Sequence, residues 1–146
     1  MKKTGFLMVA VLAVSSGQAF AADNTLHLPF SQVLELPEAQ AKLDGSVKFY
    51  LDGAATPAVK TKMGSGVSNK KTNGVGKSDE LSCGRAALSA LLAFQGSATK
   101  MGANAVVNLV SYYKQVEFKS STEYECHVGG VIVAVAFKGD YATVGK

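Results

Sequence analysis

The sequence has few of the residues from which most enzyme active sites are built. It holds two cysteines and two histidines among 146 residues. It contains no Gly-x-Ser-x-Gly segment, which would present a nucleophilic serine on a sharp turn, and no Cys-x-x-Cys pair. Nucleophilic catalysis needs a base oriented onto Ser, Thr or Cys, and only His27 and His127 are available. The sequence therefore predicts a protein that is not an enzyme and has no cofactor. Of three hypotheses for its function, a secreted hydrolase is the weakest.

A complete phosphate-binding loop is also absent. Gly74 to Ser78 is similar to the end of such a loop, but Lys71 stands where the pattern needs its first glycine. The residues before this segment are polar, whereas the pattern needs a buried strand there. We interpret the segment as a flexible loop followed by an N-capped helix, which excludes nucleotide hydrolysis.

Basic charge is too sparse to indicate nucleic-acid binding. The formal net charge is +4, but Lys2 and Lys3 lie in an N-terminal segment that we expect to be removed. Nucleic-acid binding would require a clustered basic face, and neither an RNA-binding nor a helix-turn-helix motif is present. We expect no nucleic-acid partner.

The N-terminus lacks an apolar run long enough to span a bilayer, which takes roughly twenty residues. Lys2 and Lys3 precede a short apolar run, residues 6–14, and small residues at Ala19 and Ala21 follow it. This order predicts a signal peptide over residues 1–21, cleaved near Ala21, and a single domain over 22–146 in the periplasm or outside the cell. No cysteine stands directly after the cleavage site, so we expect no lipid attached there and no stable membrane anchor.

The two cysteines, Cys83 and Cys126, would be exported together into an oxidising compartment. An even pair in such a compartment is most simply one disulfide, worth about 4 kcal/mol in the chain-entropy model. A metal or redox pair is the alternative, and the missing Cys-x-x-Cys spacing disfavours it.

The first half of the domain carries weak secondary-structure signals. Residues 22–45 predict an N-terminal arm, too Pro-interrupted for a central strand, and a short helix that begins at Pro37. Residues 46–51 alternate polar and apolar, which predicts a half-buried strand. Residues 52–77 are rich in glycine and lysine and predict a flexible loop, in which 61–67 could pair as an edge strand and 69–73 form a turn.

The second half carries stronger signals. Ser78 predicts the N-cap of a helix that runs to residue 100 or 101 and stops at Gly102. Strands are expected over 103–113, over a hairpin of 116–118 and 122–128, and over 131–137, with 141–144 as a short edge. This order predicts an α+β fold: one long helix packed on a small, mostly antiparallel sheet of about four strands, stapled by the disulfide. The strands on either side of the helix are expected to be parallel.

Three polar residues, Glu123, Glu125 and His127, alternate along one predicted strand and share a face. They are weak candidates for a metal site, because ligands two apart on a strand lie about 7 Å from each other. A solvated polar face is the better interpretation, so no metal is predicted. Tyr124 and Cys126 would then face the core.

Candidate contacts for a partner come from exposed lysines and tyrosines. Tyr112 and Tyr113 are adjacent, which predicts that they point to opposite faces, one packed and one exposed. An exposed tyrosine beside Lys114 is a plausible contact for a protein or a glycan, as are Lys70 and Lys71 in the predicted loop. An ordinary surface aromatic is the alternative.

Several segments together resemble small exported proteins of Gram-negative bacteria that are often labelled excinuclease ATPase subunit. The resemblance covers roughly residues 45 to 144, and the segments are Asn69–Asn73, Lys77–Glu80 with Cys83, Gly102–Asn108, Ser111–Lys114, Thr122–Cys126 and Val135–Asp140. The incomplete phosphate loop and the export signal argue against that label.

More distantly, a helix followed by Gly102-Ala103-Asn104-Ala105-Val106-Val107 is similar to the outer-membrane stress sensor RcsF and to YbjQ-like domains. That resemblance implies a helix on a small sheet and transfers no catalytic residue. The leading prediction is a non-enzymatic domain that binds an unknown envelope protein or cell-wall component, and the runner-up is a metal or small-ligand binder. A homo-oligomer through exposed strand edges is left open.

Overall fold

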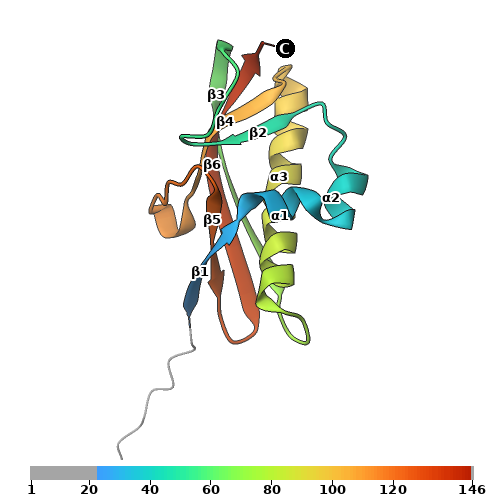
Figure 1. The fold of residues 1–146 in the computed structure, drawn as a ribbon, viewed down its shortest axis with the longest axis vertical. Coiled ribbons are helices and arrows are strands. Elements are labelled where there is room, and N and C mark those ends of the chain that lie inside the picture. The colour runs from blue at the N-terminus through green and yellow to red at the C-terminus, as the bar shows by residue number, and fades with distance from the viewer. Residues whose placement is uncertain (1–22, 146) are drawn as a thin grey trace, which may run out of the picture.

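A computed structural model describes residues 23–145 (Figure 1). The expected signal peptide, residues 1–21, lies outside the described residues. The elements, in chain order, are β1 (Asn24–Pro29), α1 (Phe30–Glu35), α2 (Pro37–Lys42), β2 (Lys48–Leu51), β3 (Val59–Asn73), α3 (Asp79–Met101), β4 (Ala105–Ser111), the 3₁₀ turn η1 (Tyr113–Gln115), β5 (Glu123–Val128) and β6 (Ile132–Val144).

The described strands form one six-stranded sheet around β6. On one side β6 pairs with β3 along nearly its whole length. On the other side its beginning pairs with β5 and the remainder with β4. β1 lies outside β5, and β2 lies outside β4 in parallel, as expected for two strands connected across a helix. The α+β class is confirmed, but the sheet is larger than the expected four strands.

The strand β3 replaces most of the loop that composition predicted over residues 52–77. Its lysines and glycines fit an edge strand, because among the described strands β3 pairs only with β6. Gly66 is needed for packing rather than for a turn: a Cβ there would lie 2.5 Å from the Tyr141 hydroxyl oxygen. The edge strand expected as an option at 61–67 is present, whereas the turn expected at 69–73 is wrong, because these residues continue the strand.

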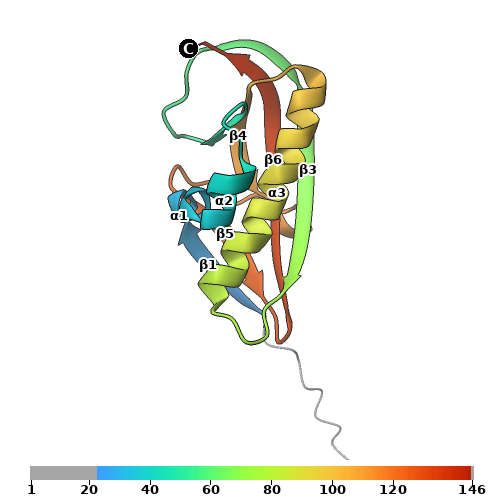
Figure 2. The same cartoon turned by 90° about the vertical axis from the view of Figure 1, so that its right-hand side faces the viewer.

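The helix α3 has the ends that its sequence predicted. The Ser78 hydroxyl accepts a hydrogen bond from the Leu81 N–H at 3.2 Å, and Gly102 ends the helix with a left-handed φ of 76°. Its buried stripe is rich in alanine with Leu91 and Phe94, so the helix backbone approaches the sheet closely. Figure 2 shows α3 lying along β3 and β6.

The N-terminal arm contains more structure than expected. Its first residues form the edge strand β1, and α1 and α2 then pack against α3, where Leu36 touches the backbone at Gly84. Arg85 donates to Glu38 at 2.9 Å and ties α3 to α2. Pro37 is the first residue of α2, as predicted.

The expected hairpin between 116–118 and 122–128 is wrong. Phe118 instead pairs with Ser111 at the end of β4, and β5 pairs with β1 and β6. The strand β6 also continues through 138–140, where a stop was expected. Gly139 allows this, because a Cβ there would lie 2.6 Å from a Val106 methyl group.

The predicted disulfide between Cys83 and Cys126 is present. It joins α3 to β5, and both residues are completely buried. The crosslink therefore lies in the core between helix and sheet, and it is compatible with an oxidising extracellular compartment.

Candidate functional site

The sheet has an inner face, packed against the helices, and an outer face that no described helix covers (Figures 1 and 2). Along β5, Tyr124, Cys126 and Val128 are buried on the inner face, as predicted. Glu125 and His127 alternate with them and lie on the outer face. The same alternation along β6 places Val133, Val135 and Phe137 inward and Ala134, Ala136, Lys138 and Asp140 outward.

The outer face brings the chain's two histidines onto one carboxylate. His27 Nε2 lies 3.2 Å from Glu125 Oε2, and His127 Nε2 lies 2.6 Å from Glu125 Oε1. The strands align them, because His27 of β1 lies directly opposite Glu125 of β5. On the other side of the His127 ring, Nδ1 lies 3.4 Å from the Thr25 hydroxyl. We call His27, Glu125 and His127 the histidine cluster.

Each imidazole of the histidine cluster is also stacked on an aromatic ring. The ring of Tyr113 lies 3.6 Å from that of His127, and the ring of Phe118 lies 4.0 Å from that of His27. Both partners belong to the segment 112–118 that follows β4. The cluster therefore links β1 and β5 to this segment and fixes its position over the outer face.

The weak metal candidates are only partly brought together. Glu125 and His127 meet, but their third partner is His27 rather than Glu123. Within residues 23–145, no three His, Cys, Asp or Glu side chains are arranged to hold a metal ion.

The prediction that Tyr112 and Tyr113 point to opposite faces is wrong. The chain leaves its extended conformation at Tyr112 and enters the 3₁₀ turn, so both side chains lie on the outer side. Tyr113 stacks on His127, and the Lys138 ammonium lies 5.1 Å from the centre of the Tyr112 ring. Both tyrosines are half-buried.

The candidate lysines divide between the two faces. Lys71 lies opposite Ala134 on the outer face, whereas Lys70 lies opposite Val135 and so belongs to the inner side. Lys114 is exposed, with its ammonium 5.3 Å from the centre of the Tyr113 ring. Lys71, Lys114 and the two tyrosines therefore share a face, and Lys70 does not.

A groove of about 520 Å³ lies between β3 and the segment 112–115. We call it the tyrosine groove, and it is lined by Val67, Asn69, Tyr112, Lys114, Gln115 and Ala136. Ala136 provides a small side chain from β6, and Val67 is 58% exposed. Lys114 and Gln115 both have left-handed backbones, with φ of 50° and 64°. Such strained residues persist only where the surroundings hold them, and they concentrate at functional sites.

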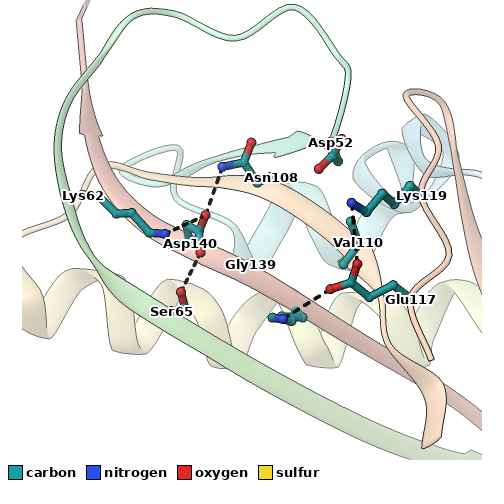
Figure 3. Close-up of a pocket in the computed structure, with 10 residues that line it drawn as sticks. Asp52, Lys62, Ser65, Asn108, Val110, Glu117, Lys119, Gly139 and Asp140 are labelled. Atoms are coloured by element: carbon teal, nitrogen blue, oxygen red, sulfur yellow. Dashed lines mark hydrogen bonds and ion pairs between the residues drawn. The ribbon is translucent and has the colours of Figure 1, made fainter. Parts of the chain in front are cut away.

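A second hollow on the outer face, of about 290 Å³, is lined by charges of both signs (Figure 3). We call it the charged pocket; its lining is Asp52, Lys62, Ser65, Asn108, Val110, Glu117, Lys119, Lys138, Gly139 and Asp140. Glu117 contacts Lys138 at 3.2 Å and Lys119 at 3.6 Å. These opposite charges largely satisfy one another within the protein.

Asp140 is the most constrained residue of the charged pocket. It accepts hydrogen bonds from Ser65 Oγ at 2.6 Å and Asn108 Nδ2 at 3.0 Å, and it lies 3.4 Å from Lys62 Nζ. Partial burial raises the pKa of the Asp140 carboxyl, but these bonds and the Lys62 charge outweigh it and lower the pKa below 3.8. Asn108 reaches Asp140 from a bulge in β4, with a left-handed φ of 51°.

Comparisons of the chain with family models, with curated proteins and with solved structures find no match. The resemblance to small exported proteins and to RcsF thus stays a prediction. Among residues 23–145, no helix has both the length and the apolar character to cross a membrane.

Sequence reasoning missed His27, Phe118, Asn108 and Asp140. His27 and Glu125 are 98 residues apart, and no local pattern connects them. The one available signal was the alternation Thr25, Leu26, His27, Leu28, which is typical of a half-buried strand but is interrupted by Pro29.

Proposed function

We propose that the protein is an exported, non-enzymatic domain that binds an acidic, extended segment of another envelope protein. The observation that supports this most directly is the tyrosine groove, an open hollow of about 520 Å³ on the sheet face without a helix cover. The periplasm, or the cell exterior, is the proposed compartment. The buried disulfide and the signal-like N-terminus support that location.

The walls of the tyrosine groove are held in place before any ligand arrives. Tyr112 N–H donates to the Ala136 carbonyl at 2.8 Å, and Ser111 and Phe118 exchange two backbone hydrogen bonds below the turn. The stacking of Tyr113 on His127 adds a side-chain contact. A preorganised groove loses little conformational entropy on binding, which favours affinity.

The chemistry of the groove suits an extended peptide. The amide groups of Asn69 and Gln115 can donate to and accept from peptide backbone groups, while Val67 and Tyr112 offer apolar surface. Lys114 is the one charged residue of the lining. Lys71 lies two residues after Asn69 on β3 and therefore on the same face of the sheet. Two lysines beside an otherwise neutral groove favour acidic side chains in the ligand.

Site-specific photo-crosslinking in cells tests the proposal. A photoreactive amino acid replaces Val67, in the groove, or Ser97, an exposed residue of α3 that serves as the matched control. We expect a discrete adduct from position 67 and none of that mass from position 97. Mass spectrometry of the adduct should identify a partner segment rich in Asp and Glu.

The charge requirement is tested by adding Lys114→Glu to the position-67 protein. Because the new carboxylate repels an acidic ligand and Lys114 lies outside the core, the yield of the adduct should fall at least about fivefold. That corresponds to a loss of about 1 kcal/mol or more in binding free energy. Identical adducts from both positions, a partner segment without acidic residues, or an unchanged yield with Lys114→Glu would each contradict the proposal.

A further inference from the structure

A second surface, separate from the tyrosine groove, consists of two apolar hollows that meet beside β2. The first, of about 340 Å³, lies between α2 and β2 and reaches Leu43 and Gly45. The second, of about 290 Å³, extends from α1 to Ala54. Both are lined by Leu34, Phe49 and Tyr50, so they form one elongated depression, which we call the β2 groove.

The β2 groove lies at an open edge of the sheet. Among the described strands β2 pairs only with β4, so its other side faces the groove rather than another strand. In Figure 1, α1 and α2 lie below β2 in the view, and Leu34, Ala39 and Gln40 of these helices line the groove. Leu34 is 36% exposed, and Phe49 and Tyr50 are half-buried, so apolar surface of all three remains accessible.

The β2 groove has one charged residue in its whole lining, Lys48. A Cβ placed on Gly45 would lie 3.9 Å from Lys48 Nζ, so the ammonium group is located at the end of the groove where Gly45 lies. Within residues 23–145, Lys48 makes no ion pair with a carboxylate. The groove therefore combines a long apolar surface with a single cation at one end.

We propose that the β2 groove binds a single-chain amphiphile with an anionic head group, such as a fatty acid. The acyl chain lies along Leu34, Phe49 and Tyr50, and the carboxylate lies against the Lys48 ammonium. A mostly apolar cleft with a few polar groups that fix the orientation of the ligand is the usual form of a small-molecule site. A ligand with a cationic head would place like charges together at Lys48. This groove shares no residue with the tyrosine groove, so the two proposals stand independently.

Titration of the purified mature protein with dodecanoate, below its micelle concentration, tests the site by ¹⁵N NMR. We expect chemical-shift changes confined to residues 30–54 and 121–122. From octanoate to decanoate to dodecanoate, affinity should rise about fourfold for each methylene that enters the groove (about 0.8 kcal/mol). Undecyltrimethylammonium, with the same eleven-carbon alkyl tail and the opposite charge, should bind more weakly.

Two variants separate the contribution of the head group from that of the chain. Lys48→Gln should lower the affinity for dodecanoate about twofold to fivefold, the range for an exposed ion pair, and should remove the preference over undecyltrimethylammonium. Leu34→Gln should weaken both amphiphiles, whereas Lys100→Gln, an exposed control on α3, should change neither. Shifts spread over the whole surface, equal affinity of the wild type for the two amphiphiles, or an unchanged preference in Lys48→Gln would overturn the proposal.

Discussion

The two faces of the sheet are built from alternate residues of the same strands, yet different interactions stabilise them. The inner face buries Phe94, Tyr124 and Phe137 together with the disulfide. The outer face has a smaller apolar cluster, Ala105, Val107, Ala142 and Val144, and is otherwise held by hydrogen bonds and ion pairs, among them the histidine cluster and the bonds to Asp140. Apolar burial and the crosslink therefore specify the fold, and the outer face is free to carry polar groups suited to a ligand.

Removal of the crosslink should have the largest effect on stability. Replacing both cysteines, Cys83→Ala with Cys126→Ala, increases the number of conformations that the unfolded chain can adopt. It also leaves a small cavity between α3 and β5. We expect a loss of about 4 kcal/mol in the free energy of unfolding, measured by urea denaturation of the mature protein.

The wild type treated with a reductant serves as the control for the cavity, because it loses the bond and keeps both sulfur atoms. It should lose nearly as much stability as the double variant. Two free thiols per unfolded, unreduced wild-type chain would show instead that the crosslink does not form.

Removal of the charge at the centre of the histidine cluster should have a smaller effect. Glu125→Gln keeps the shape of the side chain but loses the charge-assisted bonds to His27 and His127, which should cost about 1 kcal/mol. Glu123→Gln is the matched control, one outward position earlier on β5 and outside the cluster, and should stay within about 0.5 kcal/mol of wild type. Thermal unfolding compares the two, and equal losses would mean that the cluster does not stabilise the outer face.

The same comparison explains which parts of the structure could be predicted from sequence. The helix α3 was predicted to within a residue because its signals are local: Ser78 at one end, Gly102 at the other. The disulfide followed from composition and compartment. Only part of the strand β3 was predicted, residues 61–67 as a possible edge strand, and its continuation through residue 73 was missed. An edge strand pairs on one side, so lysines and glycines are tolerated along it.

The outer-face sites could not be predicted because their members are distant in sequence. His27 contacts Glu125 because β1 pairs with β5. Neither segment contains a sequence pattern that predicts this pairing. Tyr113 was selected as a candidate contact, but it stacks on His127 within a turn whose next residue, Lys114, has a left-handed backbone. Non-glycine residues seldom adopt that conformation.

The smallest expected effect concerns Asp140, and it is recognisable by its dependence on pH. The pKa of this carboxyl is lower in the folded protein than its ordinary value of 3.8, so the ionised form stabilises the fold. That contribution is complete above the unfolded pKa and is lost as pH falls through the lower folded pKa. Asp140→Asn should therefore be less stable than wild type at pH 7, by about 1 kcal/mol or less, and the difference should shrink below about pH 4.

Urea denaturation at pH 7, 5, 4 and 3 measures this difference in stability. Asp52→Asn is the control, because Asp52 lies in the same charged pocket but lacks the bonds from Ser65 and Asn108. A difference that stays constant down to pH 3 would show that the ionised carboxylate of Asp140 gains no stability from Ser65, Asn108 and Lys62.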